Sequence, residues 1–207
     1  FLNYRESVER ASAYLSEQGF SVSAFHGGLD QRGRESALYR FANGSACILV
    51  STDLGSRGLD IPDVENIIHY HMPETKEAYL HRIGRTARWD KNGRAFFILA
   101  SGEKIPDYVA GDIPNYSLSP KGMPARPRMT TLYIGKGKKD KISKGDLVGF
   151  LCKKGGLSKD DIGRIDVRDY YCYVAVSRSK AAEMLKKVRG EKIKGLRTLV
   201  EIAAPEA

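Results

Sequence analysis

Helical and strand-like patterns alternate along residues 1–118. A period near 3.6 predicts three amphipathic helices, over residues 5–19, 30–44 and 75–87. Short apolar runs predict four strands, over residues 21–25, 46–51, 64–72 and 94–100. Buried strands that alternate with helices are typical of a parallel sheet with helices on both faces. Ligands of such sheets bind in loops beyond the carboxyl ends of the strands, so those loops are the first candidates for a site.

The order of elements changes after a proline-rich stretch. Five of the eight prolines lie within residues 106–127, and the run SPKGMPARPR, residues 119–128, shows no apolar period. Downstream, the pattern predicts the order strand, helix, strand, strand, helix, strand, which is the βαββαβ arrangement of ferredoxin-like RNA-recognition (RRM) modules. We therefore predict an α/β protein with a parallel-sheet domain at residues 1–118, a linker at 119–129 and an RRM-like domain at 130–205.

Charge is distributed unevenly between these parts. The net charge is +9, yet residues 1–125 carry 14 Lys and Arg against 15 Asp and Glu, whereas residues 126–207 carry 20 against 10. The whole basic excess therefore belongs to the second part. A concentrated excess of this kind favours a polyanionic partner, most often nucleic acid.

The apolar runs argue against a membrane protein, and the cysteines argue against a disulfide framework or a metal site. No apolar run approaches the roughly 20 residues that a membrane span needs, so we expect no membrane partner. Cys47, Cys152 and Cys172 are odd in number and lack the paired spacing of disulfide frameworks or metal sites. We expect buried free thiols, a cytoplasmic location and no metal ligands. The chain begins at Phe1 without a start methionine, and we expect it to be a piece of a longer protein.

The stretch FHGGLDQRGRES, residues 25–36, joins a strand to a helix. Gly27 and Gly28 let backbone N–H groups approach an anion, and Gln31 and Arg34 lie three apart on the first helical turn. Such donors at a helix N-terminus suit a phosphate backbone. A tight turn followed by a solvated helix start explains the same residues equally well.

The loop STDLGSRGLDIP, residues 51–62, leaves the predicted strand at 46–51, where a parallel sheet places its ligand. Hydroxyls and exposed backbone suit phosphates, and carboxylates accept hydrogen bonds from ribose hydroxyls. The residues of interest are Thr52, Asp53, Arg57, Gly58 and Asp60. In the alternative, Asp60 before Ile61 and Pro62 only forms a turn.

The segment HRIGRTARW, residues 81–89, concentrates positive charge. Arg85 and Arg88 lie three apart, which makes them neighbours on successive helical turns, and two adjacent guanidinium groups need an anion or carboxylates. Arginine fingers stabilise charge in phosphoryl transfer in this way. Gly84 in mid-helix costs roughly 1 kcal/mol relative to alanine and so needs a packing reason. His81 alone is better explained as a structural histidine than as a catalytic base.

Four of these segments occur in a recognisable order. FLNYRES, HGGLDQRGRE, ILVSTDLGSRGLDIP and HRIGRTAR together resemble the C-terminal RecA-like domain of DEAD-box RNA helicases, over approximately residues 1–118. The resemblance implies that Arg85 and Arg88 reach the γ-phosphate of ATP, that Asp60 touches its ribose, and that His81 and Arg82 couple the nucleotide to the RNA side. Gly58 is assigned both to the RNA backbone and to the nucleotide. The other residues implied at the RNA are Gly27, Gln31, Arg34, Thr52, Asp53 and Arg57.

Two hallmarks of a complete ATP site are absent from the sequence. There is neither a G-x-x-x-x-G-K-[ST] phosphate loop nor a D-E-A-D segment. The resemblance therefore implies that ATP and Mg serve the full-length enzyme, with Mg held by an N-terminal RecA-like domain of the same polypeptide. The 207-residue chain alone is expected to be inactive and to require no cofactor.

The predicted RRM-like domain carries aromatic and basic candidates. Strand alternation places Tyr133, Tyr171 and Tyr173 on one face, where they could stack RNA bases, although tyrosines also simply fill half-exposed sheets. LYIGKG fits the short ribonucleoprotein motif, whereas DYYCYVAV fits the longer one only partly, with Asp169 and Tyr170 in place of a basic residue and glycine. The excess charge favours RNA contact by a loop whose basic residues are Lys136, Lys138, Lys139 and Lys141.

Residues 130–203 are similar to the C-terminal RNA-binding domain of DbpA-type DEAD-box proteins. The resemblance implies an ATP-dependent RNA helicase that locally unwinds structured RNA, with large-subunit ribosomal RNA during assembly as its target. Two other functions stay open: a non-enzymatic RNA-binding or chaperone module, and a DNA helicase or translocase with the same core.

Overall fold

The computed structural model describes residues 1–56, 64–86, 93–119 and 123–203. The chain divides into two compact units, one formed by Phe1–Arg34 with Ile48–Ala125 and the other by Glu35–Cys47 with Arg126–Ala207. The proposed boundaries at 118 and 130 stay predictions. No helix in the described ranges is long and apolar enough to cross a membrane.

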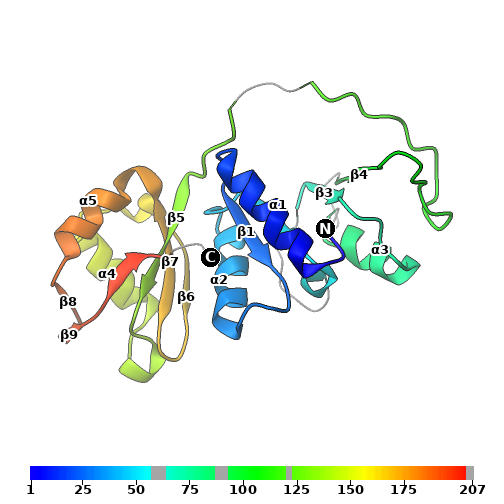
Figure 1. Cartoon of the computed structure of the whole chain (residues 1–207). Coiled ribbons are helices and arrows are strands. Elements are labelled where there is room, and N and C mark those ends of the chain that lie inside the picture. Colours follow the sequence, from blue (N-terminus) through cyan, green and yellow to red (C-terminus); the bar gives the residue numbers. More distant parts are fainter. Residues whose placement is uncertain (57–63, 87–92, 120–122, 204–207) are drawn as a thin grey trace. The chain divides into compact units, whose positions relative to one another are not determined.

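The first unit contains short parallel strand pairs and helices, as the alternating pattern predicts. Strand β1 (Val22–Phe25) pairs with β2 (Ile48–Ser51), and β3 (Asn66–His69) pairs with β4 (Arg94–Phe97), both in parallel. Figure 1 shows helix α1 (Arg5–Glu17) lying alongside β1. Its Val8 is buried with Leu2, Val22 and Val50 in a small apolar core.

Residues 1–3 tie the two strand pairs together. The Leu2 N–H donates to the Ser51 carbonyl at 3.0 Å, at the carboxyl end of β2. The nitrogen of Phe1 donates to the Ile68 carbonyl at 2.5 Å, and the Phe1 carbonyl accepts from Tyr70 N–H at 3.0 Å, at the end of β3. The opening segment thus satisfies backbone groups of both pairs, as buried polar groups require.

Two predictions about this unit are wrong in detail. Helix α3 (Lys76–Ile83) begins after the Thr75 cap, whose hydroxyl accepts from Ala78 N–H at 3.1 Å, but it ends with Gly84 as its C-cap. Gly84 is therefore a terminus and not a mid-helix residue. Strands β3 and β4 are not covered on both faces, because Ile68 is 49% exposed and the first two residues of β4 are exposed.

The second unit has the predicted βαββαβ order. Its four-stranded sheet runs β10-β5-β7-β6, and every neighbouring pair is antiparallel. The elements are β5 (Met129–Ile134), α4 (Lys144–Lys153), β6 (Ile162–Val167), β7 (Cys172–Ser177), α5 (Arg178–Val188) and β10 (Val200–Ile202). This order is that of the ferredoxin-like fold.

The last predicted strand, residues 196–203, is divided in the structure. A small hairpin of β8 (Lys192–Ile193) and β9 (Leu196–Arg197) precedes β10. Its turn residues Lys194 and Gly195 have φ angles of 52° and 82°. Two successive positive φ angles are the geometry of a tight two-residue hairpin turn, so the chain reverses before it enters the sheet.

The core of the second unit lies between one sheet face and its helices. Leu132 and Ile134 of β5 are fully buried with Leu147 of α4 and Met184 of α5. Tyr133 alternates to the other face and pairs in register with Tyr173 of β7. The alternation predicted for this face is confirmed.

The three cysteines form no disulfide with one another, and Cys172 is the one that is fully buried. Cys172 has no exposed surface, and burial raises the pKa of its thiol to about 11. Cys152 is half-buried. Cys47 is exposed, so the prediction of three buried thiols is wrong for this residue.

The packing around Leu147 gives a direct test of the second unit. Leu147→Ala leaves a cavity beside Leu132 and Ile134, and we expect it to lower the free energy of unfolding by about 2–5 kcal/mol. Leu199→Ala is the control, because Leu199 is 55% exposed and its removal should cost less than about 0.5 kcal/mol. Denaturant titration followed by circular dichroism measures both; equal losses would contradict the described core.

Candidate nucleic-acid and nucleotide interface

Gly27 and Thr52 lie at the ends of neighbouring parallel strands. Phe25 of β1 is in register with Ser51 of β2, and the Thr52 N–H donates to the Phe25 carbonyl at 3.2 Å. A Cβ on Gly27 would lie 3.7 Å from the Leu54 side chain, so the two loops approach each other closely. The structure therefore brings together two residues predicted for RNA contact, at the edge where such sheets bind ligands.

The turn that contains Gly27 is held by polar contacts. Asp30 caps α2 (Gln31–Ala42), since its Oδ1 accepts from Gly33 N–H at 2.6 Å. Arg34 donates from Nη1 to the Leu29 carbonyl at 2.5 Å and from Nη2 to Gln31 Oε1 at 3.0 Å. The predicted pair Gln31 and Arg34 is thus joined by a hydrogen bond, and Arg34 also braces the turn.

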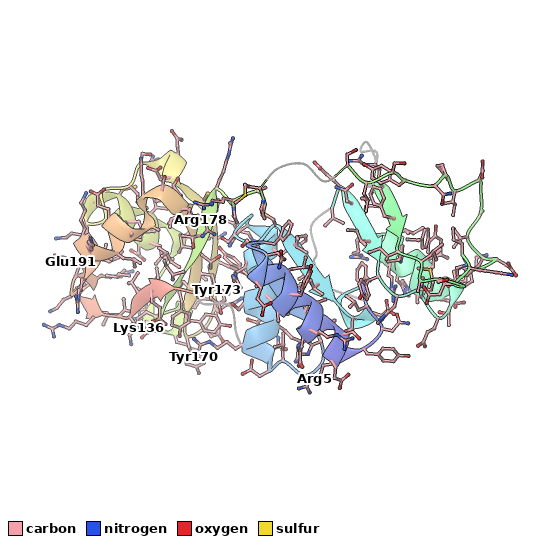
Figure 2. All side chains as sticks on the ribbon, turned by 45° about the horizontal axis from the view of Figure 1, so that its top comes forward. Arg5, Lys136, Tyr170, Tyr173, Arg178 and Glu191 are labelled. Atoms are coloured by element: carbon pink, nitrogen blue, oxygen red, sulfur yellow. The ribbon has the colours of Figure 1, made fainter. Side chains whose placement is uncertain are left out.

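Arg5 is a cation at this turn that sequence reasoning missed. Its Cζ atom lies 2.6 Å from where a Cβ on Gly28 would stand, so only glycine leaves room for this contact without a shift of Arg5. Its Nε donates to Glu9 Oε1 at 2.9 Å. Figure 2 shows Arg5 at the edge of the first unit. The quoted segment FLNYRES contained Arg5, but nothing in the sequence placed it beside Gly28.

Arg82 is fully buried and bonds to several separate segments of the first unit. It makes a two-pronged ion pair with Asp53, with Nε to Oδ1 at 2.5 Å and Nη2 to Oδ2 at 2.9 Å. Nη1 donates to the His71 carbonyl at 2.8 Å, and Nη2 donates to Asn3 Oδ1 at 2.8 Å. The guanidinium carbon also lies 5.4 Å from the centre of the Phe1 ring.

These contacts refine the predicted roles of Asp53 and Arg82. Asp53 follows Thr52 at the end of β2, whereas Arg82 lies in the last turn of α3. The carboxylate that was predicted among the RNA contacts is therefore used to hold α3 to that loop. A forked guanidinium paired with a carboxylate fixes distance and orientation together. Sequence reasoning missed Asn3, which is 79 positions from Arg82.

His69 completes the surroundings of Arg82. Its ring is fully buried, stacks on Phe97 with centroids 4.7 Å apart, and places Nδ1 3.5 Å from Arg82 Nη1. Burial first, and then the nearby Arg82 charge, lower the pKa of His69 from 6.5 to about 3. The imidazole is therefore neutral at physiological pH and adds no second charge beside the guanidinium.

Arg85 lies just after α3, because the helix ends at Ile83. Its N–H donates to the Arg82 carbonyl at 3.2 Å, and its carbonyl accepts from Val64 N–H at 3.0 Å. The predicted helical spacing of Arg85 and Arg88 is not observed for Arg85, and Arg88 lies outside the described residues. Arg57, Gly58 and Asp60 also lie outside them. His81 is exposed in the last turn of α3, one residue before the buried Arg82.

The lysine-rich loop of the second unit is fixed to a neighbouring turn. Lys138 N–H donates to the Arg168 carbonyl at 2.8 Å, and Lys139 N–H donates to the Asp169 carbonyl at 2.9 Å. A Cβ on Gly137 would lie 2.3 Å from the Arg168 carbonyl oxygen, so glycine is needed at this crossing. Lys136 pairs with Asp140 at 3.0 Å, whereas the side chains of Lys138, Lys139 and Lys141 are exposed.

The three predicted stacking tyrosines are mutual neighbours. Their ring centroids lie 5.3–6.0 Å apart, with Tyr133, Tyr171 and Tyr173 each near the other two. They differ in access, because Tyr173 is 3% exposed and stacks on Tyr39 within the same unit at 5.1 Å. The structure thus assembles the predicted cluster but leaves little free face on Tyr173.

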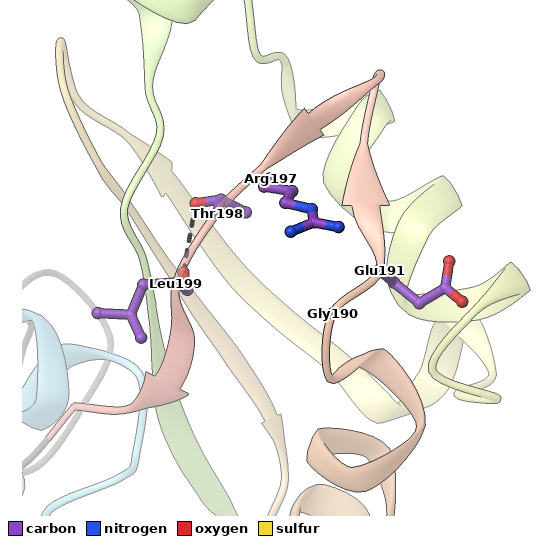
Figure 3. Close-up of a pocket in the computed structure, with 5 residues that line it drawn as sticks. All are labelled: Gly190, Glu191, Arg197, Thr198 and Leu199. Atoms are coloured by element: carbon purple, nitrogen blue, oxygen red, sulfur yellow. Dashed lines mark hydrogen bonds between the residues drawn. The ribbon is translucent and has the colours of Figure 1, made fainter.

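A shallow hollow beside the β8–β9 hairpin offers little chemistry. Figure 3 shows Arg197 and Glu191 on its two sides and Thr198 bonded to the Leu199 carbonyl at 3.3 Å. Glu191 already pairs with Lys154 at 3.3 Å. Among the described residues, no group of three or more His, Cys, Asp or Glu side chains is arranged to hold a metal ion.

Two family models match the chain. Residues 1–90 match the helicase conserved C-terminal domain, and residues 131–202 match the DbpA RNA binding domain. The two matches fall on either side of the proline-rich stretch.

Curated relatives match across both parts. The ATP-dependent RNA helicase DbpA of Escherichia coli strain K12 is 38% identical over 202 residues, which are 94% of this chain and 44% of that protein. The protein of the same name from Bacillus subtilis strain 168 is 30% identical over 224 residues, covering 94% of this chain and 47% of the relative. The chain thus spans about half the length of these relatives.

Solved helicase structures are similar to the chain over about half its length. The RNA helicase Prp28 from Chaetomium thermophilum, bound to ADP, is 44% identical and covers 48% of this chain and 24% of its own, with a TM-score of 0.44. A DEAD box protein from Methanococcus jannaschii is 38% identical and covers 48% of this chain and 27% of its own, with a TM-score of 0.46.

Removing the partner of the buried Arg82 should destabilise the first unit. Asp53→Asn leaves the guanidinium buried without its carboxylate, and we expect a loss of about 3–5 kcal/mol in the free energy of unfolding. Arg82→Lys should also lose stability, because an ammonium cannot reproduce the fork. Glu9→Gln, which breaks the exposed pair with Arg5, is the control and should hardly move the denaturation midpoint. A midpoint equally insensitive to Asp53→Asn would contradict the role of the pair.

Burial of neutral His69 should make the first unit sensitive to acid. The folded pKa of about 3 lies below the unfolded value of 6.5, so the unfolded chain binds a proton that the folded chain does not. Stability should therefore fall as pH drops from 6.5 toward about 4, where carboxylates begin to titrate.

His69→Phe tests this assignment, because it keeps an aromatic ring beside Phe97 and removes the titration. Urea titrations across this pH range should show a shallower loss in the variant. Some slope will remain, because burial also lowers the pKa values of His26 and His71. Identical slopes in the variant and the parent would show that His69 does not carry the effect.

Proposed function

Because the chain belongs to the DEAD-box RNA helicases of the DbpA type, we propose that it serves ATP-dependent local unwinding of structured RNA. The observation that carries this proposal is the Arg82–Asp53 ion pair. It joins the loop after β2, where Thr52 lies, to the end of α3, directly before Arg85. A rigid link between a predicted RNA contact and a predicted nucleotide contact is what coupling requires.

On the RNA side, we propose that the phosphate backbone follows the ends of β1 and β2. Gly27 permits close approach of the backbone, and Gln31 is exposed at the start of α2. Arg34 is held in place by its bonds to Leu29 and Gln31, so an arriving phosphate meets an ordered guanidinium. Thr52 adds a hydroxyl from the neighbouring loop.

On the nucleotide side, the guanidinium chemistry of Arg85 fits a phosphate, and we assign Arg88, Asp60 and Gly58 to the same nucleotide from the family resemblance. ATP, with Mg held by another RecA-like domain, supplies the free energy when bound. Arg85 is positioned by backbone bonds to Arg82 and Val64, so movement at the Arg82–Asp53 pair reaches it through one turn of chain. His81 flanks the pair on the exposed side of α3.

The second unit is proposed to hold the enzyme on its RNA. The basic excess of residues 126–207 and the exposed lysines of the loop support attraction to phosphates. Tethering raises the local concentration of the helicase core near its duplex. The DbpA-type resemblance supports large-subunit ribosomal RNA as the target and ribosome assembly as the setting, and three cysteines without a disulfide among them support a cytoplasmic location.

Two other functions make different demands on the same residues. A non-enzymatic RNA-binding or chaperone module would bind RNA without needing Arg85. A DNA helicase or translocase would not discriminate against DNA, whereas readout of 2′-hydroxyls makes RNA strongly preferred. Competition between RNA and DNA of one sequence therefore separates the second alternative from our proposal.

The test of the proposed function uses the polypeptide extended by its N-terminal RecA-like domain. It should show RNA-stimulated ATPase activity, whereas the 207-residue chain should show none. In the extended protein, Arg85→Ala should lower ATPase turnover by roughly 10³-fold or more, the effect of an arginine finger, while RNA affinity stays unchanged.

Lys104→Ala, outside the described helices and strands, is the control for loss of one positive charge. Unchanged ATPase in the Arg85 variant would overturn the finger role of Arg85, whereas RNA binding without ATPase in the extended protein would favour the non-enzymatic alternative. Turnover by the 207-residue chain alone would show that its own residues complete the ATP site.

A further inference from the structure

We propose that Tyr170 forms, with Lys138 and Lys139, a corner on the second unit that takes an unpaired RNA base and its flanking phosphates. The proposal deepens the proposed function, since it rests on RNA being the ligand of this unit, and it names the residue that contacts a base. Tyr170 lies in the turn between β6 and β7 and is 69% exposed.

The two loops of this corner are held together by their backbones. Lys138 and Lys139 donate N–H groups to the carbonyls of Arg168 and Asp169, the two residues directly before Tyr170. Gly137 lets the chains cross so closely that any Cβ would strike the Arg168 carbonyl. The lysines and the tyrosine are therefore carried by one fixed structure, and their spacing does not depend on two independent loops.

The charges of the corner leave a net positive surface. Asp140 pairs with Lys136, and Asp166 pairs with Arg168 at 3.1 Å. Glu35 also faces Arg168, at 3.7 Å. Within the described part of the chain, Lys138, Lys139 and Lys141 have no ion-pair partner, and Asp169 is a further carboxylate beside them. Five cations against four carboxylates leave a net charge of +1, and the unpaired ammonium groups are available to a phosphate backbone.

Tyr170 offers an accessible ring face for stacking, which the buried Tyr173 does not. Tyr173 is 3% exposed, whereas Tyr170 presents most of its ring outside the sheet, along the same edge of the unit as Lys136 in Figure 2. An exposed aromatic ring in a turn that is bonded to a lysine-bearing loop matches a base and its flanking phosphates. A paired base inside a helix cannot stack on a side chain in this way, so the corner should select unpaired nucleotides.

The experiment measures RNA affinity of the full 207-residue chain and its variants. The probes are a hairpin RNA with a fluorescent adenine analogue in its loop and a blunt duplex with the same stem. Tyr170→Ala should weaken hairpin binding by about tenfold, within the roughly five- to 150-fold range for one stacked base, and should reduce quenching of the loop fluorophore. Duplex binding should change little. Tyr170→Phe should keep both properties.

Two further variants separate stacking from charge and from general loss of an aromatic side chain. Lys138→Gln with Lys139→Gln should lower the dependence of log affinity on log salt by about one to two, whereas Tyr170→Ala should leave that slope unchanged. Tyr14→Ala, at a tyrosine 61% exposed on α1, is the matched control and should leave hairpin affinity unchanged.

The outcomes distinguish the two proposals. If the parent chain binds hairpin RNA and Tyr170→Ala binds it equally well, the stacking corner is wrong and the proposed function stands. If the parent chain binds neither RNA, both are wrong. If a polyglutamate peptide displaces hairpin RNA from the parent chain and loses affinity with Tyr170→Ala, the corner serves an acidic protein segment and the RNA assignment is overturned.

Discussion

The first unit depends on keeping one positive charge buried. The guanidinium of Arg82 has no exposed surface, and a charge removed from water in this way costs several kcal/mol unless nearby groups compensate for it. Its compensation comes from three separate places: the carboxylate of Asp53 after β2, the carbonyl of His71 after β3, and the amide oxygen of Asn3. Because these segments must converge for the charge to be satisfied, the pair specifies how the strand ends and α3 meet. The neutral state of His69 belongs to the same arrangement, since a second cation 3.5 Å from Nη1 would oppose it.

The second unit depends on apolar packing instead. One face of its sheet packs on the helices, and the other face carries polar side chains. Alternation along β5 sends Leu132 and Ile134 into the core and Tyr133 to the opposite face. The loops that leave the sheet then carry the exposed charge, and Gly137 permits two of them to cross in contact. Its basic groups are therefore displayed around a core of apolar side chains.

Much of the fold could be predicted from residue patterns. The features that could not be predicted share a cause, since they depend on contacts between distant residues or on local backbone geometry. Periods of 2 and 3.6 located the strands and helices, because both reflect burial of one face. The burial of Arg82 was out of reach, because an arginine in a helix with charged neighbours is typical of a solvated face, and its partners lie 29 and 79 positions away. The end of α3 at Ile83 and the division of residues 196–203 by a turn at Lys194 and Gly195 depend on local backbone geometry that periodicity does not report. Asp53 was placed correctly at the end of a strand, but its partner could not be inferred from the motif alone.

The hydrogen bonds of residues 1–3 also bear on the order in which the molecule folds. Phe1, Leu2 and Asn3 bond to groups at Ser51, Ile68, His71 and Arg82, so this segment completes its contacts only after α3 has formed. Closing a loop of this length carries an entropic cost before any contact repays it. The contacts of α1 and of the β1–β2 pair join residues that are closer in sequence, so they can form before α3 does. Residues 1–3 are therefore among the last parts of the first unit to be fixed in place.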